Sequence, residues 1–300
     1  MTLKKLENYI PHPDSPIECD IFISYSCQEP RSSNTTEKLS IAAKKTCTLV
    51  DKTSVFFSRV DDQHPEHFKS LELLLNTVRF IASTTDSPLR IVADISCLPR
   101  KQMADLLASI VEISQNMEVE MVALYSLAEF TPPNESTLAN LSIEPVHKAF
   151  AGWSTPDTKP TSLILGLGYE PDKAEGASEY FEPSDQWIFI PKSPVTEFFH
   201  QVNLNNSNLI EETDKNHLIE YDVSDPEMTY GQLELVISSL IRSSNPVLLP
   251  FGPKIFFFLC LIQCLTHPEL GVWQVESEET QHIVEVRASV HIIGLRCLFA

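Results

Sequence analysis

The sequence predicts an α/β fold, made of two Rossmann-like domains with mainly parallel sheets. Three observations predict it. Short apolar segments typical of buried strands alternate with segments of helical periodicity along most of the 300-residue chain. A stretch with five prolines and little periodic hydrophobicity, residues 131–161, separates two such series. All eight glycines lie in the second half of the chain, residues 151–300, so the two halves also differ in composition.

We therefore expect a first domain at residues 1–130, a proline-rich linker at 131–161 and a second domain at 162–300. Within the linker we expect one short helix near residues 146–150. Residues 284–292 alternate apolar with polar side chains, which indicates a half-exposed edge strand at the C-terminal end of the second domain.

Four strands and three helices are expected in the first half. Asn34 and Glu37 have the spacing of a capping box, which predicts a helix that continues to about Lys45. Pro65 suits the first turn of a second helix, which continues to Ala82. The third helix covers residues 103–113. The apolar runs typical of strands are residues 20–25, 54–58, 90–95 and 119–125.

The second half repeats this plan, and parallel strands with right-handed crossovers are expected in both. The expected helices lie near residues 173–181, after Ser193 and Pro194, after a capping box at Ser224 and Glu227, and at 254–265. The expected strands are residues 162–167, 186–190, 217–221, 246–249 and 272–275. Similar segments follow the opening strand of each half, residues 26–31 and 167–172. Internal duplication and chance similarity both remain open as explanations.

The chain is acidic, with 22 Lys and Arg against 41 Asp and Glu and a formal net charge of −19. Binding to a nucleic-acid backbone needs basic residues that release counterions from phosphates, so direct nucleic-acid binding is not expected. The same charge disfavours an anionic membrane surface. The longest apolar run, residues 255–265, falls well short of the roughly 20 residues of a membrane-spanning helix.

The N-terminus and the cysteines bear on where the protein is found. No apolar segment follows the lysines near the N-terminus, so a secretory signal is not expected. Seven widely spaced cysteines indicate reduced thiols rather than a disulfide scaffold. We therefore expect a cytoplasmic protein.

Ligands of open parallel sheets bind beyond the carboxyl ends of the strands. Two of these ends, residues 99–101 and 252–254, carry cations at the start of a helix. A helix N-terminus favours an anion, so this arrangement points to a nucleotide or another phosphorylated small molecule. The alternative is that the prolines only end strands and start helices, with solvated cations beside them. The candidate ligand-binding residues are Gly252, Lys254, Arg100, Lys101, Glu29 and Glu170.

Two familiar nucleotide-binding motifs are incomplete or absent. Gly166 and Gly168 follow a strand, but Gly176 comes too late to complete a dinucleotide fingerprint. The chain has no Walker A sequence, which excludes P-loop ATP hydrolysis. We expect no bound cofactor.

Metal and nucleophile motifs are equally sparse. His64 and His67 stand three residues apart without further ligands in sequence, so no metal site is expected. Cys260 and Cys264 share one face of an apolar helix, which is typical of core thiols. Cys97 could act as a nucleophile if a histidine approached it, and a buried thiol is the alternative. The catalytic residues, if there are any, stay unknown.

The opening strand of the first half, CDIFISYS at residues 19–26, resembles the first strand of TIR domains. The resemblance covers about eight residues. It implies NAD hydrolysis by a glutamate on a later helix, and Glu72 is the rough candidate. The WCxxE-like context of that glutamate is absent, since this half has no tryptophan.

The second half is similar to the Rossmann-like sensor domains called CARF domains. The resemblance covers the order of elements over residues 162–276 and the turn Phe251-Gly252-Pro253-Lys254, where proline replaces a hydroxyl residue. It implies binding of a cyclic oligonucleotide by a regulatory protein of a prokaryotic antiviral defence system.

Together these observations favour a cytoplasmic regulatory protein that senses a nucleotide or phosphate ligand and acts through a protein partner or a homo-oligomer. An enzyme is the less favoured class. The first alternative is a TIR-like or other Rossmannoid nucleotide hydrolase that uses Glu29 or Glu72. The second is a non-catalytic subunit whose acidic second half docks on a basic partner.

Overall fold

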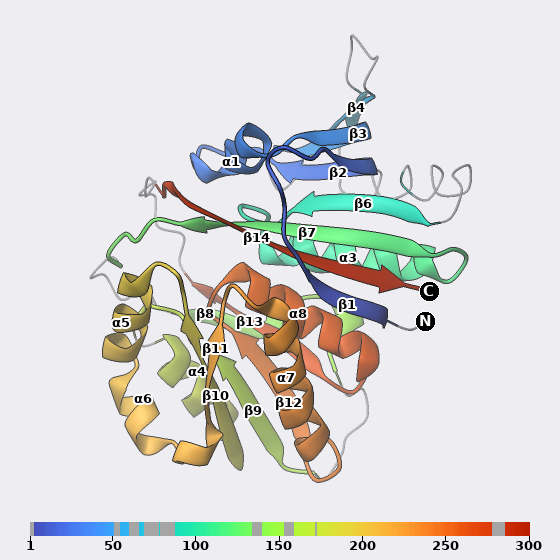
Figure 1. The fold of residues 1–300 in the computed structure, drawn as a ribbon. Coiled ribbons are helices and arrows are strands. Elements are labelled where there is room, and N and C mark those ends of the chain that lie inside the picture. Colours follow the sequence, from blue (N-terminus) through green and yellow to red (C-terminus); the bar gives the residue numbers. More distant parts are fainter. Residues whose placement is uncertain are drawn as a thin grey trace. The chain divides into compact units, whose positions relative to one another are not determined.

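A computed structural model describes residues 3–50, 55–59, 66–68, 78, 88–133, 140–152, 159–171, 173–277 and 286–300. The fold is α/β and contains two Rossmann-like units (Figure 1). Unit 1 combines residues 1–129 with the C-terminal residues 284–300, and unit 2 comprises residues 130–283. The chain therefore leaves unit 1 once and returns to it for the last strand. The predicted fold class is confirmed.

Unit 1 is built on an eight-stranded sheet in the order β1-β14-β7-β6-β2-β3-β4-β5. The four strands from β7 to β3 are parallel, and both flanks are antiparallel. The strands are β1 Leu3–Tyr9, β2 Ile17–Tyr25, β3 Ile41–Leu49, β4 Val55–Arg59, β5 Glu66–Phe68, β6 Leu89–Asp94, β7 Val119–Ala128 and β14 Ala288–Phe299. The expected strands near residues 20–25, 54–58, 90–95 and 119–125 are therefore present, with residue 54 outside the described part.

In the described part of unit 1, two crossover helices connect neighbouring parallel strands. Helix α1, Arg31–Lys38, links β2 to β3, and helix α3, Arg100–Ser114, links β6 to β7. In the strand order β7-β6-β2-β3, the step from β2 to β3 and the step from β6 to β7 go in opposite directions across the sheet. Right-handed connections therefore place α1 and α3 on opposite faces of the sheet. Helix α3 begins three residues before the expected one and buries Met103, Leu107 and Ile110.

The helix expected from Asn34 to Lys45 is wrong in both bounds. Helix α1 already begins at Arg31 and ends at Lys38, and the strand β3 follows. Asn34 is not a cap, because its side chain donates to the Ser126 hydroxyl on β7 at 2.6 Å. The segment IAAKKTCTL pairs in parallel with β2 over its whole length. Sheet pairing overrides the local helical signal here.

The helix expected between Pro65 and Ala82 lies mostly outside the described residues. At its start the structure has the short strand β5, Glu66–Phe68, antiparallel to β4. Val78 is helical and buried. Pro65 and Ala82 themselves are not described.

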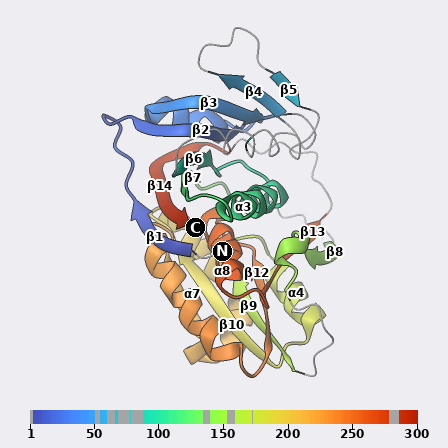
Figure 2. The same cartoon turned by 90° about the vertical axis from the view of Figure 1, so that its right-hand side faces the viewer.

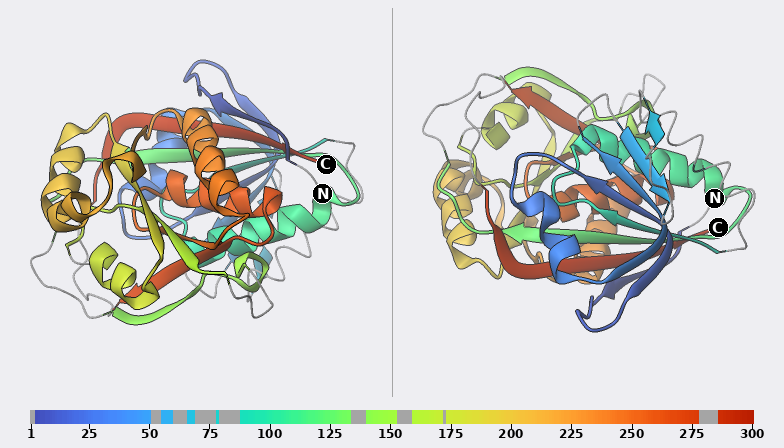
Figure 3. Two further views of the ribbon diagram at one scale, coloured as in Figure 1. Left: turned by 90° about the horizontal axis from the view of Figure 1, so that it is seen from below. Right: turned by 90° about the horizontal axis from the view of Figure 1, so that it is seen from above.

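The C-terminal segment is an inner strand of unit 1, which corrects two expectations. Strand β14 lies between β1 and β7 and pairs antiparallel with both, so it is neither an edge strand nor part of the second domain (Figure 3). Leu295, Cys297 and Phe299 are buried there. The actual edge strand, β1, was not expected, because its sequence LKKLENY is mostly polar.

Unit 2 is built on a six-stranded sheet in the order β11-β10-β9-β12-β13-β8. The first five strands are parallel and follow the Rossmann order 3-2-1-4-5, and β8 closes the sheet antiparallel to β13. The strands are β8 Asn140–Pro145, β9 Thr161–Gly166, β10 Asp185–Lys192, β11 Leu218–Asp222, β12 Asn245–Pro250 and β13 Gly271–Ser277. All five strands expected in the second half are present.

Strand β8 lies within the segment predicted to be a linker. Residues 140–145 pair with β13 instead of spanning two domains, and the 3-10 helix η1, Lys148–Phe150, occupies the place of the expected short helix. Proline-rich composition hid this strand, which sits at the sheet edge where proline is tolerated.

Helices cover both faces of the second sheet (Figure 2). Side chains of α4, α5 and α6 form one core cluster with β9, β10 and β12. Helices α7 and α8 pack together, and Phe256 of α8 contacts Phe189 and Tyr221 of the sheet. Helix α7 is capped by Asp225 and not by Ser224. The helices are α4 Lys173–Phe181, α5 Thr196–Asn205, α6 Ser207–Glu212, the 3-10 helix η2 Lys215–His217, α7 Pro226–Leu240 and α8 Lys254–Thr266.

None of the described helices has both the length and the apolar character needed to cross a lipid bilayer.

Candidate functional site

The carboxyl ends of β9 and β12 form the switch point of the second sheet. The two strands are parallel neighbours, whereas the chain first passes from β9 to β10 on the other side of β9. Ligands of doubly wound sheets bind where the strand order reverses in this way. The loops that follow β9 and β12 carry Glu170 and Gly252, so this edge unites two of the predicted positions.

These two loops are in backbone contact. The amides of Phe251 and Gly252 both donate to the carbonyl oxygen of Gly166, at 2.8 and 3.1 Å. A Cβ atom at Gly252 would lie 2.5 Å from the carbonyl oxygen of Leu167, and one at Gly168 would lie 3.0 Å from that of Phe251. Glycine at position 252 therefore has a steric reason, because any side chain would push the loops apart.

Helix α8 begins directly at this switch point. Its first residue is Lys254, which is partly buried, and Pro253 occupies the N-cap position. Pro253 supplies no side-chain cap, and the first turn contains no acidic residue. The helix dipole and the amides of the first turn therefore favour an anion at this end, next to the lysine ammonium.

Two asparagines that the sequence analysis missed hold the loop after β9. The side-chain amide of Asn206 donates to the carbonyl of Gly168 at 3.0 Å, and that of Asn205 donates to the carbonyl of Tyr169 at 2.6 Å. Asn206 is buried, and it follows the last residue of α5. Glu170 is exposed and lies 3.5 Å from the ammonium of Lys173. The sequence signal that could have pointed to them is the pair of consecutive asparagines at the end of a helix.

A second polar centre lies at the carboxyl edge of the first sheet. Asp94, the last residue of β6, accepts hydrogen bonds from the amide and the hydroxyl of Ser96 at 2.9 and 2.5 Å. The Ser96 hydroxyl in turn accepts from the amide of Ser126 at 2.8 Å. Because Asn34 donates to the Ser126 hydroxyl, this network joins β6, β7 and α1.

Asp94 is a buried carboxyl group. Burial raises its pKa above the ordinary range, although the hydrogen bonds from Ser96 and the positive charge of Arg31 act in the opposite direction. The network around Asp94 fixes the chain where it leaves β6. Cys97 follows three residues after Asp94.

Glu29 is paired with Arg31 on the loop after β2. The Arg31 Nε donates to a Glu29 carboxylate oxygen at 2.5 Å, and its Nη1 donates to the Ser126 carbonyl at 3.4 Å. Burial acts to lower the pKa of Arg31, but its interactions with Tyr125, Glu29 and Cys97 outweigh burial and raise it. Arg31 therefore stays charged and holds the Glu29 carboxylate in place.

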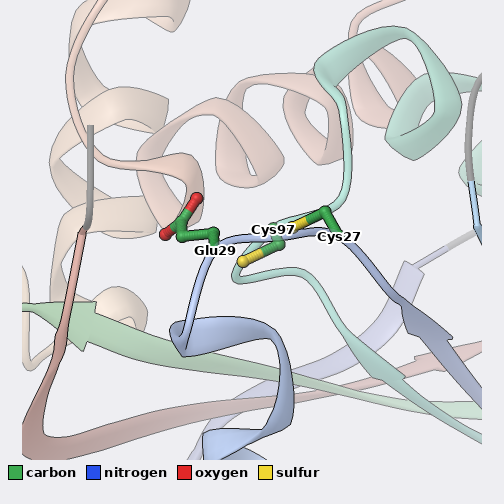
Figure 4. Close-up of side chains that lie close together, drawn as sticks. All are labelled: Cys27, Glu29 and Cys97. Atoms are coloured by element: carbon green, nitrogen blue, oxygen red, sulfur yellow. The ribbon is translucent and has the colours of Figure 1, made fainter. Parts of the chain in front are cut away.

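Cys27, Glu29 and Cys97 form a compact cluster in unit 1 (Figure 4). The two sulfur atoms and a carboxylate oxygen all lie within 4.8 Å of one another. Cys27 is exposed and Cys97 is buried. The cluster contains no histidine, so the condition set for Cys97 as a nucleophile is not met within it.

Arg100 and Lys101 open helix α3, in unit 1. Pro99 is the N-cap residue and supplies no side-chain cap. Arg100 is partly buried and Lys101 is exposed. Their position after β6 places them on the same sheet edge as Cys97, whereas Gly252, Lys254 and Glu170 belong to unit 2.

Other sequence candidates have structural roles or lie outside the described residues. Cys264 is buried in α8 with its pKa raised by burial, and Cys260 beside it is buried too, so both are core thiols. A Cβ at Gly166 would lie 2.3 Å from the Phe256 ring, so this glycine serves packing. Glu72 and His64 are not described.

No protein-family model matches the chain, and no curated protein matches its sequence.

Proposed function

We propose that the protein is a regulatory sensor that binds a nucleotide or another phosphate-bearing small molecule at the switch point of unit 2. Lys254 and the first-turn amides of α8 hold the phosphate. Gly252 lets the loops after β9 and β12 lie in direct contact beside this helix N-terminus. The proposal concerns binding and includes no catalytic step.

The observation that carries the proposal is the position of the α8 N-terminus. It lies at the reversal of the strand order, has a proline that cannot cap it at the N-cap position and carries a lysine as its first residue. A phosphate bound at this helix N-terminus interacts favourably both with the dipole and with the lysine ammonium. The CARF-like turn at residues 251–254 supports a cyclic oligonucleotide as the first ligand to test.

The experiment is a thermal unfolding screen of the full chain with NAD, ATP and a panel of cyclic mono- and oligonucleotides. A ligand at about 100 times its Kd stabilises the native state by about 2.7 kcal/mol, which raises Tm by several degrees. We expect a selective rise that Lys254→Ala abolishes, while the circular dichroism spectrum of the variant stays unchanged.

The matched control is Lys215→Ala. Lys215 is an exposed lysine of the same unit, but it precedes β11 and therefore lies at the opposite, amino edge of the sheet. This variant should keep the full rise in Tm. If no ligand of the panel shifts Tm, or if both lysine variants respond like the unmodified chain, the proposal is wrong.

A further inference from the structure

We propose that Cys27, Cys97 and Glu29 form a binding site for a thiophilic divalent metal ion, Zn²⁺ being the best match, with one coordination position left for water or a ligand. The site belongs to unit 1 and is independent of the phosphate site proposed for unit 2.

The spacing of the three side chains fits one ion. Their ligand atoms lie within 4.8 Å of one another. Zinc binds sulfur at about 2.3 Å and carboxylate oxygen at about 2.0–2.2 Å in tetrahedral geometry, so its ligand atoms stand roughly 3.5–3.8 Å apart. The three ligand atoms therefore have to approach one another by roughly 1 Å to bind one ion.

Both loops that carry the ligands are fixed by hydrogen bonds. On the β6 side, Ser96 bonds Asp94 through its amide and hydroxyl immediately before Cys97. On the β2 side, the Ser32 hydroxyl donates to the carbonyl of Cys27 at 3.3 Å, and its amide donates to the carbonyl of Glu29 at 3.0 Å. A rigid scaffold of this kind lowers the cost of assembling a metal site.

Arg31 supplies the outer-shell partner that metal-binding carboxylates usually have. Its Nε holds one oxygen of Glu29 at 2.5 Å, and a carboxylate has lone pairs enough to bind a metal ion as well. Arg31 is itself anchored on the Ser126 carbonyl. The arginine thus holds the Glu29 carboxylate in place and does not have to leave when a metal ion binds.

The charges balance both with and without the ion. Without metal, the Arg31 cation and the Glu29 anion cancel. Binding one Zn²⁺ releases one proton from each thiol, so two thiolates, one carboxylate, one guanidinium and the ion again sum to zero. This neutrality suits a partly buried position, where an unbalanced charge would be costly.

The donor set selects the class of ion. Thiolates favour zinc and other thiophilic metals over Mg²⁺ or Ca²⁺, which prefer oxygen ligands. Three protein ligands with an open fourth position are typical of reactive zinc sites, whereas structural zinc sites are closed by four ligands. The sequence analysis expected no metal here, because the ligands come from two separate loops and form no short motif.

The test is a titration of the reduced full chain with Zn²⁺ under anaerobic conditions, followed by competition with a chromophoric chelator. We expect one ion per chain and the release of two protons, measured from the heat in buffers of different ionisation enthalpy. Co²⁺ should give thiolate-to-metal charge-transfer absorption. Cys27→Ser should weaken binding by at least about 100-fold, since even outer-shell changes cost about 10–100-fold.

Cys27 is exposed, so the fold should tolerate its replacement, and Glu29→Gln is a second variant that should also weaken binding. The matched control is Cys19→Ala, which removes a buried cysteine on β2 and should leave affinity unchanged. No saturable binding by the reduced chain would overturn the proposal. Unchanged metal affinity in Cys27→Ser would also overturn it. A Cys27–Cys97 disulfide, together with a reduced form that binds no metal, would do the same.

Discussion

The sulfur atoms of Cys27 and Cys97 lie within 4.8 Å of each other, although they belong to different strand–loop–helix segments of the chain. The reason is the register of β2 and β6, parallel neighbours in which Ile23 pairs with Ala93. Continued along both strands, this register sets position 27 opposite position 97. Adjacent strands are about 4.8 Å apart, so the sheet itself brings the two loops together.

The contrast in exposure between the cysteines predicts selective alkylation. Of the seven cysteines, Cys27 is the exposed one, and burial raises the pKa of Cys19 to about 12. We expect iodoacetamide to modify one thiol of the native chain rapidly, because alkylation needs an accessible thiolate. Mass spectrometry of peptides should locate the label on Cys27, and Zn²⁺ should slow its attachment. Rapid labelling of Cys19 instead would contradict the structure.

Local sequence patterns predicted most of unit 2. Helix α4 has the expected bounds, and β9 differs from its expected range by one residue at each end, because each is read from its own local pattern. The errors fall where pairing partners are remote. Strand β14 alternates like an edge strand, but its neighbour β1 comes from the other end of the chain, and no local pattern reveals that partner.

The inner position of β14 predicts a large difference between two substitutions in the same strand. The Phe299 side chain is 0% exposed, whereas that of Val290 is 80% exposed. Phe299→Ala should lower the free energy of unfolding by about 3–5 kcal/mol, because it leaves a cavity in the core. Val290→Ala should change it by no more than about 0.5 kcal/mol. Urea denaturation followed by circular dichroism compares them, and similar costs would place β14 at the surface.

The candidate sites were only partly predictable. The turn at residues 252–254 and the carboxylate of Glu29 could be located, because strand ends followed by helix starts are visible in sequence. Arg31, Asn34 and Ser126 were missed, since their hydrogen bonds join segments that are distant along the chain. Cys27 was likewise not paired with Cys97. That pairing requires the order of strands in the sheet, which alternation of strands and helices does not supply.

Two glycines with opposite surroundings test the backbone contact at the switch point of unit 2. At Gly252 a Cβ would lie 2.5 Å from the Leu167 carbonyl oxygen, whereas at Gly231, inside α7, it would meet nothing within 4 Å. Gly252→Ala should cost about 1–3 kcal/mol of stability and remove any nucleotide-induced rise in Tm. Gly231→Ala should add about 0.5–1 kcal/mol. Equal effects in thermal unfolding would show that the loops are not in contact.

Asp94 should make the stability of unit 1 depend on pH in a defined direction. Burial raises its pKa in the native state above the value of about 3.9 found in unfolded chains. Between these two pKa values the native state binds more protons than the unfolded state. Its free energy of unfolding therefore falls as pH rises through this window, by at most about 1.4 kcal/mol per pH unit for one group. Below the lower pKa the carboxyl is protonated in both states, so burial of a charged carboxylate no longer lowers the free energy of unfolding.

Asp94→Asn isolates this effect, because the amide cannot ionise but keeps an oxygen that accepts from Ser96. Urea denaturation of both proteins from about pH 4 to pH 7 gives the difference in free energy of unfolding, native chain minus variant. We expect this difference to fall as pH rises and then to level off. A rise with pH would mean that the hydrogen bonds from Ser96 and the charge of Arg31 outweigh burial, so that Asp94 is held as an anion in the native state.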